Sequence, residues 1–225
     1  MRVVSVNVGL PRTMRWKGRN VTTAIFKTPV EGRVPLRRLN LAGDRQADLS
    51  VHGGAEKAIY AYPLEHYGFW QAELGTELPL GAFGENLTVE GLPVEEQVAV
   101  GDRFRIGTAE LVVTQPRVPC YKLGLRFGRE DMVKRFLASR RTGYYLAVEA
   151  EGDVGAGDLV ETLALHPARI PVSEIIRVYA TDRDDLATME RLVALDALPD
   201  DWRSYFEKKL LAASVAETLR QRRAG

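Results

Sequence analysis

Cysteine and histidine are scarce in this sequence, which has one cysteine and three histidines among 225 residues. A lone cysteine cannot form a disulfide within the chain, and this suits a reducing compartment. Structural zinc sites and iron–sulfur clusters need more ligands of these two types, in closer spacings, than the chain provides. The residues concerned are Cys120, His52, His66 and His166.

Long apolar runs, a strong net charge and familiar enzyme motifs are also missing. No run of about 20 apolar residues could span a membrane, and the opening MRVVSVNVG is too short and too alternating for a secretory segment. A net charge of +1 gives no argument for a nucleic-acid partner. No P-loop, dinucleotide fingerprint, Ser-centred elbow or HExxH occurs. We therefore expect a soluble, cytoplasmic protein with neither a membrane nor a nucleic acid as partner.

Residues 1–165 contain a series of short predicted β-strands. Their turns are rich in Gly, Pro and Asp, and helices do not alternate regularly with them, which favours a closed β-barrel over a doubly wound sheet. Two helices, Leu64–Leu74 and Glu130–Ser139, are expected to cover the barrel. The expected strands are Arg2–Val8, Val21–Lys27, Lys57–Tyr62, Asn86–Val89, Gly101–Gly107, Ala109–Gln115, Gly143–Ala150 and Gly157–Leu165.

The pattern changes after the segment HPARIP, and residues 172–222 show helical periodicity instead. Asp182 or Asp184 can cap the second of three helices, and Pro199-Asp200 opens the third. The predicted fold class is therefore mainly β (α+β), with a barrel domain over residues 1–165 and a three-helix appendage over residues 172–222.

Polar residues gather in the long loop that precedes Pro63. Arg45, His52 and Lys57 follow neither a helical nor a strand period. Gly53-Gly54 allows positive φ, which can turn successive N–H groups toward an anion such as a phosphate. A loop histidine bonded to a backbone carbonyl and a solvated lysine are the alternatives that spacing alone leaves open.

A second polar segment is FGENLTVEG, in which Gly84 marks a close approach of the backbone and Asn86 begins a strand. The Asn86 amide can either bridge two loops or bind a ligand. Spacing alone favours the structural role.

The third segment, TQPRVPCYKL, contains the single cysteine. Pro116 and Pro119 fix φ, so that Arg117 to Cys120 should form a rigid, non-helical connector at the end of a strand. The cations of Arg117 and Lys122 favour the thiolate, which is the form that attacks and the form that binds metals. The alternative is an inert buried thiol, because free cysteine is often a core residue.

Taken together, these segments resemble one known family. GD-QAD-HGG-KA-YP-EHY, FGENLT, a further GD, QPR-PCYKL and TG-Y occur in this order. The ordered set resembles the MOSC domain family, and most closely its YiiM-type branch, and the likeness runs through nearly the whole chain, including the three C-terminal helices. Two departures are that Glu56 stands where Asp is common and Ala147 where many members carry Arg.

The resemblance implies a β-barrel that binds molybdenum cofactor (Mo-molybdopterin), with the metal on the dithiolene and on Cys120. It also implies an oxidoreductase that reduces, and so detoxifies, N-hydroxylated compounds such as N-hydroxylated purine bases. Cys120 and His52 are then the expected catalytic residues, His52 as proton donor because imidazole titrates near neutral pH. The expected cofactor-binding residues are Arg45, His52, Gly53, Gly54, Lys57, Asn86, Arg117 and Lys122.

The same reasoning implies a small N-hydroxylated substrate and, since the chain cannot hold an iron–sulfur cluster, a separate electron-donor reductase. Two alternatives stay open. Cys120 could carry a persulfide in a sulfur carrier, or the chain could be a non-catalytic module that binds a cofactor or partner. The oligomeric state does not follow from the sequence.

Overall fold

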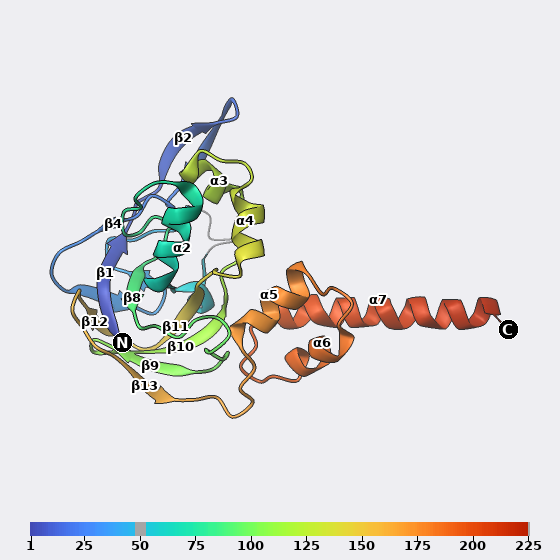
Figure 1. Cartoon of the computed structure of the whole chain (residues 1–225). Coiled ribbons are helices and arrows are strands. Elements are labelled where there is room, and N and C mark those ends of the chain that lie inside the picture. The colour runs from blue at the N-terminus through green and yellow to red at the C-terminus, as the bar shows by residue number, and fades with distance from the viewer. Residues whose placement is uncertain (48–52, 225) are drawn as a thin grey trace.

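An eight-stranded sheet forms the main body of the protein (Figure 1). The structure, a computed structural model, describes residues 1–47 and 53–224. The strands of the sheet are β1 (Arg2–Val8), β4 (Thr28–Pro29), β7 (Ile59–Pro63), β8 (Leu87–Glu90), β9 (Arg103–Ile106), β10 (Ala109–Pro116), β11 (Tyr144–Ala150) and β13 (Val160–Ala164). Their order is β13-β9-β10-β11-β7-β8-β1-β4, antiparallel except for the parallel pair β7 and β8.

Two smaller sheets accompany the large one. β5 (Val34–Arg37) lies between β12 (Gly152–Val154) and β6 (Asn40–Leu41), and β2 (Arg12–Trp16) pairs with β3 (Arg19–Thr23) in a hairpin that projects from one end of the molecule (Figure 1).

The closed barrel expected from the sequence is not confirmed. A barrel needs a continuous hydrogen-bonded ladder around its whole circumference. Here β1 meets the β13 region through the isolated bridge between Arg2 and Leu159 and a few backbone hydrogen bonds, such as that from Val160 N to Met1 O at 3.0 Å. The observed fold is a mixed α+β structure with a large sheet.

Three helices cover one side of the sheet and share an aromatic core (Figure 1). They are α2 (Glu65–Leu74), α3 (Tyr121–Phe127) and α4 (Met132–Ser139). Phe136 of α4 stacks on Trp70 of α2 at 5.5 Å between ring centroids, and Phe83 stacks on Tyr62 at 4.7 Å. The expected covering helices are confirmed, whereas α3 was not predicted.

The three expected C-terminal helices are present as α5 (Val172–Ala180), α6 (Leu186–Val193) and α7 (Asp200–Ala224). Ile175, Leu192 and Phe206 are fully buried in the same apolar cluster as the strands of the sheet. The far end of α7 extends away from the rest of the molecule (Figure 1). The division into two domains at these boundaries stays a prediction.

Two local expectations need correction. The cap of α6 is Asp185, whose carboxylate accepts a hydrogen bond from Thr188 N at 3.0 Å, while Asp182 pairs with Arg177. The strand expected over Val21–Lys27 ends at Thr23, because β3 pairs with β2 in a hairpin. Residues 24–27 instead form a loop that lines the pocket described below.

A short 3₁₀ helix, η1 (Ala55–Lys57), precedes β7. Among residues 1–47 and 53–224, no helix combines the length and the apolar character needed to cross a membrane.

Candidate functional site

The candidate site begins where β10 ends. Pro116, the last residue of β10, pairs with Tyr144 of β11, and Arg117 N then donates to Gly143 O at 3.2 Å. Residues 117–120 belong to no helix or strand, and Cys120 has extended backbone angles (φ −115°, ψ 174°) immediately before α3. The non-helical connector predicted from the two prolines is confirmed, and it holds a half-buried thiol just after the end of a strand.

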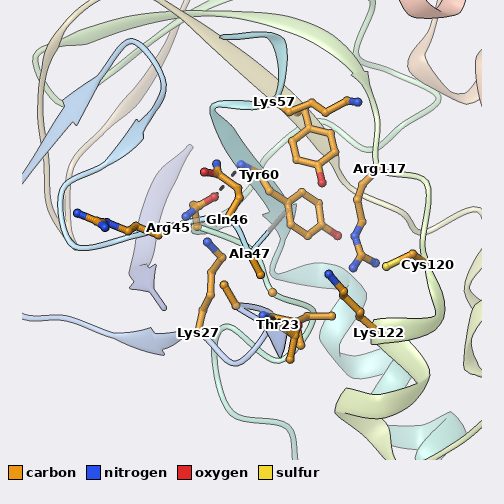
Figure 2. Close-up of a pocket in the computed structure, with 15 residues that line it drawn as sticks. Thr23, Lys27, Arg45, Gln46, Ala47, Lys57, Tyr60, Arg117, Cys120 and Lys122 are labelled. Carbon is orange, nitrogen blue, oxygen red and sulfur yellow. Dashed lines mark hydrogen bonds between the residues drawn. The ribbon is translucent and has the colours of Figure 1, made fainter. Parts of the chain in front are cut away.

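Cys120 lines a pocket, here called the cationic pocket, with an empty volume of about 600 Å³ (Figure 2). Five of its fifteen lining residues carry a positive charge, and none of these described lining residues carries a carboxylate. Such a lining favours an anionic ligand. The lining residues are Thr23, Ala24, Ile25, Lys27, Arg45, Gln46, Ala47, Lys57, Tyr60, Gly84, Asn86, Arg117, Cys120, Lys122 and Tyr145.

Arg117 is the most unusual of these cations because its side chain is buried yet forms no salt bridge within the described part of the chain. Its guanidinium lies 5.3 Å from the ring centroids of Tyr60 and of Phe136, and these aromatic faces partly compensate the charge. Its Nη1 finds no hydrogen-bond partner among the described residues. Figure 2 shows the guanidinium beside the Cys120 sulfur, and the Lys122 amino group pointing into the pocket next to it. The arrangement supplies donors for an anion beside the thiol.

Lys27 is a pocket cation that the sequence did not single out. Its ammonium pairs with the Asp44 carboxylate, which also accepts hydrogen bonds from Gly9 N at 2.8 Å and from Asn86 Nδ2 at 2.9 Å. Burial lowers the pKa of Lys27, and the Asp44 carboxylate opposes that shift. Because Asp44 neutralises Lys27, the cations most available to a ligand come from elsewhere in the pocket.

Asn86 lies at the pocket, but protein contacts occupy its amide. Besides Asp44, its Nδ2 contacts Asn7 O at 3.3 Å, and its Oδ1 accepts from Tyr60 N at 3.1 Å. Its observed contacts therefore position β7 and the Asp44 carboxylate. Gly84 has φ +81°, and a Cβ there would lie 2.8 Å from Ile25 Cγ1, so the close approach expected at this glycine is confirmed.

The structure brings together Arg45, Lys57, Arg117 and Lys122 with Cys120, although their roles in binding stay predictions. Gly53 and Gly54 are not among the residues that line the pocket. Gly54 adopts φ +102°, and its carbonyl accepts from Lys57 N at 3.1 Å, so Gly54 shapes the turn into η1. His52 lies outside the described residues.

Two tyrosines that line the pocket were also not predicted as site residues from the sequence. Tyr60 and Tyr145 face each other on the paired strands β7 and β11, with ring centroids 5.4 Å apart. Burial raises the pKa of Tyr145, and the Arg117 guanidinium partly opposes this. The phenol therefore keeps its proton at neutral pH and can donate a hydrogen bond beside the thiol.

Comparisons with known proteins bear directly on this geometry. The MOSC domain model matches residues 48–161, and the model described as YiiM-like, 3-alpha helix domain matches residues 170–213. The chain is 43% identical to the uncharacterized protein YflK of Bacillus subtilis, over 92% of this chain and 93% of that relative. It is 35% identical to protein YiiM of Escherichia coli, over 88% and 89% of the two chains.

The chain belongs to the MOSC domain family. Its C-terminal helices belong to the YiiM-like three-helix domain. Crystal structures agree with this assignment. YiiM from Geobacillus stearothermophilus has a TM-score of 0.79 at 34% identity, covering 93% of this chain and 98% of that one. YiiM from Escherichia coli has a TM-score of 0.74 at 28% identity, covering 95% and 94%.

A protein named "Reductase" from Gibberella moniliformis is 33% identical over 90% of this chain, which spans 36% of that longer protein. Within the present MOSC protein, the matched range contains eight of the fifteen lining residues, Cys120 among them, whereas the other seven, including Lys27 and Arg45, precede it. The cationic pocket therefore extends beyond the segment that the family model recognises.

MOSC domains are known as molybdenum cofactor-binding domains, and the pocket residues fit that group by their chemistry. Molybdenum is a soft metal that favours a thiolate, which Cys120 can supply. The cofactor is anionic, and the orphaned Nη1 of Arg117 is a buried donor in need of an acceptor.

Proposed function

We propose that this MOSC protein binds molybdenum cofactor in the cationic pocket and reduces N-hydroxylated compounds to amines. One observation carries the proposal. The only thiol of the chain lines a pocket with five cations and no carboxylate among its described lining residues. The family membership and a relative named "Reductase" support an oxidoreductase.

Each pocket residue would have a distinct task. Cys120 would ligate the metal, Arg117 and Lys122 would neutralise the charge around the metal ligands, and Arg45 and Lys57 would bind the phosphate. When bound, the cofactor supplies the two-electron chemistry. The buried aromatic rings beside Arg117 keep water from the guanidinium and strengthen its interaction with an anion.

The reaction balances as one N-hydroxy compound, two electrons and two protons giving one amine and one water. The N–O bond breaks, nitrogen is reduced, and the departing oxygen leaves in the water. The electrons come from a separate reductase. The Tyr145 hydroxyl lies in the pocket with Cys120 and can hydrogen-bond the departing oxygen, and His52 stays a candidate proton donor.

Cys120→Ser tests the proposal because serine keeps the shape of the side chain but removes the soft ligand. In protein purified from a cofactor-producing host, we expect the reduction rate to fall by about 100-fold or more. The loss of a residue that only supports a metal ligand already costs about 10- to 100-fold, and Cys120 would be a ligand itself. Because Cys120 is half-buried in a loop, the melting temperature should change by less than about 2 °C. Reductase assays with a chemical electron donor, metal analysis and melting curves give the three readouts.

Tyr121→Phe is the matched control, since this neighbouring side chain is 55% exposed and lines no described pocket. It should leave the rate unchanged. A serine variant that still reduces N-hydroxy compounds would refute the role of Cys120. Purified wild-type protein that contains a persulfide on Cys120 and no molybdenum would instead support the sulfur carrier.

A further inference from the structure

The hairpin of β2 and β3 carries positive charge only. Residues 12–23 include four cations and no carboxylate. Lys17 and Gly18, both with positive φ, form its two-residue turn, and the two strands project together from the end of the molecule (Figure 1). Arg15 and Arg19 are exposed and form no salt bridge among the residues that the structure describes. The hairpin therefore presents positive charge without an ion-pair partner in the described chain.

Three contacts hold the hairpin against α3 and the loop after it. The Arg12 guanidinium lies 3.8 Å from the Phe26 ring centroid, and the Arg126 guanidinium of α3 lies 5.0 Å from the same centroid. At the tip, the Lys17 ammonium pairs with the Glu130 carboxylate at 2.8 Å. Burial and the nearby Arg12 charge lower the pKa of Arg126. Two arginines thus share one aromatic ring, and neither forms a salt bridge within the described residues.

This positive surface continues into the cationic pocket. Lys122 lines that pocket with Cys120 and lies one turn before Arg126, so the two cations share a face of α3. Ile25, the residue before Phe26, lines the pocket as well. The inner end of the surface is therefore the pocket that holds the thiol. We name the surface the hairpin face, and its cations without a salt bridge in the described chain are Arg12, Arg15, Arg19, Lys122 and Arg126.

We propose that the hairpin face docks the electron donor, and that this donor is a protein with carboxylates around a flavin or iron–sulfur group. The inference rests on the proposed reductase function, which takes its electrons from outside the chain. Per turnover, two electrons leave the donor, which is oxidised, and reduce one N–OH group with two protons to an amine and water. Opposite charges speed the encounter and fix the orientation of the donor. Its redox group is then held toward the pocket that contains Cys120.

A nucleic acid fits the hairpin face less well than an acidic protein. Nucleic-acid binding commonly uses about 6–10 phosphate contacts, whereas the face has five described cations without a salt bridge and the whole chain has a net charge of +1. Transient electron-transfer complexes use small interfaces, below about 1,200 Å², which a hairpin and one helix can supply. An electron donor must also approach the pocket beside the face, and a nucleic acid need not.

Arg15→Glu/Arg19→Glu is the test variant, because both side chains are exposed and lie outside the cationic pocket. Arg183→Glu/Arg191→Glu is the matched control. It changes the net charge by the same amount at two exposed arginines around α6, far from the hairpin (Figure 1), which form no salt bridge within the described chain. Melting curves of both variants should match that of the wild type to within a few degrees, about the effect of surface substitutions.

The first measurement is the binding of a flavodoxin, an acidic flavin protein used as the probe, to the full-length protein without cofactor. Surface plasmon resonance at about 0.01 M ionic strength keeps the charges unscreened over about 30 Å. We expect the test variant to weaken binding by about 10-fold or more and the control to leave it unchanged. In 1 M salt, where screening acts within about 3 Å, the difference should disappear.

Three results of this measurement would overturn the assignment. They are equal affinity in the wild type and the test variant, no binding of flavodoxin by either, and an equal loss in the control, which would show an effect of net charge alone. A DNA duplex that binds more tightly than flavodoxin at physiological salt would overturn it too, in favour of a nucleic acid.

The second measurement follows the reduction of an N-hydroxy compound by the cofactor-loaded protein with two donors. Reduced flavodoxin needs a docking surface, whereas photoreduced riboflavin is a small molecule that needs none. The test variant should raise KM for flavodoxin by about 10-fold or more and leave the rate with riboflavin unchanged. Equal losses with both donors would show a structural effect and overturn the assignment. If flavodoxin binding depends on Arg15 and Arg19 but neither donor supports reduction, the reductase function fails and the docking site for an acidic protein stands.

Discussion

The buried pair of Lys27 and Asp44 makes a quantitative prediction about the wall of the cationic pocket. The Lys27 side chain is 10% exposed and that of Asp44 1% exposed. Lys27→Met keeps the length of the side chain and removes its charge. The Asp44 carboxylate then retains hydrogen bonds from Gly9 N and Asn86 Nδ2 but has lost its charged partner.

An unpaired buried charge is expensive, and the loss of one partner of a buried pair costs about 3–5 kcal/mol. For a chain of this size, each kcal/mol corresponds to about 2–4 °C in melting temperature, so Lys27→Met should lower the midpoint by about 6–20 °C. The assay is thermal and urea-induced unfolding at pH 7 of the protein without cofactor, followed by circular dichroism.

The double variant Lys27→Met/Asp44→Asn removes both charges and should recover at least about half of the lost stability, because neutralising both members of a buried pair costs less than leaving one unpaired. Lys122→Met is the control. Lys122 lines the same pocket and forms no ion pair within the described part of the chain, so its replacement should cost no more than about 0.5 kcal/mol. A loss below about 1 kcal/mol for Lys27→Met, or a double variant as unstable as the single one, would refute the reasoning.

Two further predictions concern acid stability and cofactor loading. The Arg177 guanidinium and the Thr188 amide hold the pKa of Asp185 at about 2, so the stability that the carboxylate contributes is present above about pH 4 and is lost as the pH falls toward about 2. Asp185→Asn should therefore lower the melting temperature at pH 6 but hardly at pH 2, and an offset that is the same at both pH values would contradict this. Arg117→Lys removes a planar donor set held between two aromatic rings and should lower the pterin content of protein from a cofactor-producing host by about 10-fold or more. A pterin content equal to that of the wild type would contradict the role of Arg117.

The sequence predicted well those elements whose apolar pattern is periodic. β1 occupies Arg2–Val8 as expected, and the three C-terminal helices lie where helical spacing put them. The hairpin of β2 and β3 was missed because its two strands are polar and largely exposed. α3 was missed because Pro119 and Gly124 flank or interrupt its short sequence, and its helix depends on Leu123, which is fully buried in the aromatic core.

For the candidate site, loop residues were easier to predict than core residues. Cys120 and four surrounding cations were predicted as site residues because they fit no strand or helix period. Lys27 was taken as the end of a strand. A periodic pattern shows that a residue faces inward but not whether packed side chains or a cavity lies there.

The hydrogen bond between Gln115 and Trp202 has a consequence for how such a protein can change over evolutionary time. Gln115 Oε1 accepts this bond from Trp202 Nε1 at 2.9 Å. Gln115 is two residues before Arg117 on the strand that leads to Cys120, whereas Trp202 belongs to a helix that carries none of the pocket cations. Exchanges at Tyr179 or Tyr205 can therefore alter the aromatic wall that α5 and α7 form and leave Cys120 and its cations in place. The helical wall can thus vary while the cationic pocket stays the same, provided that the link from Gln115 to Trp202 is kept.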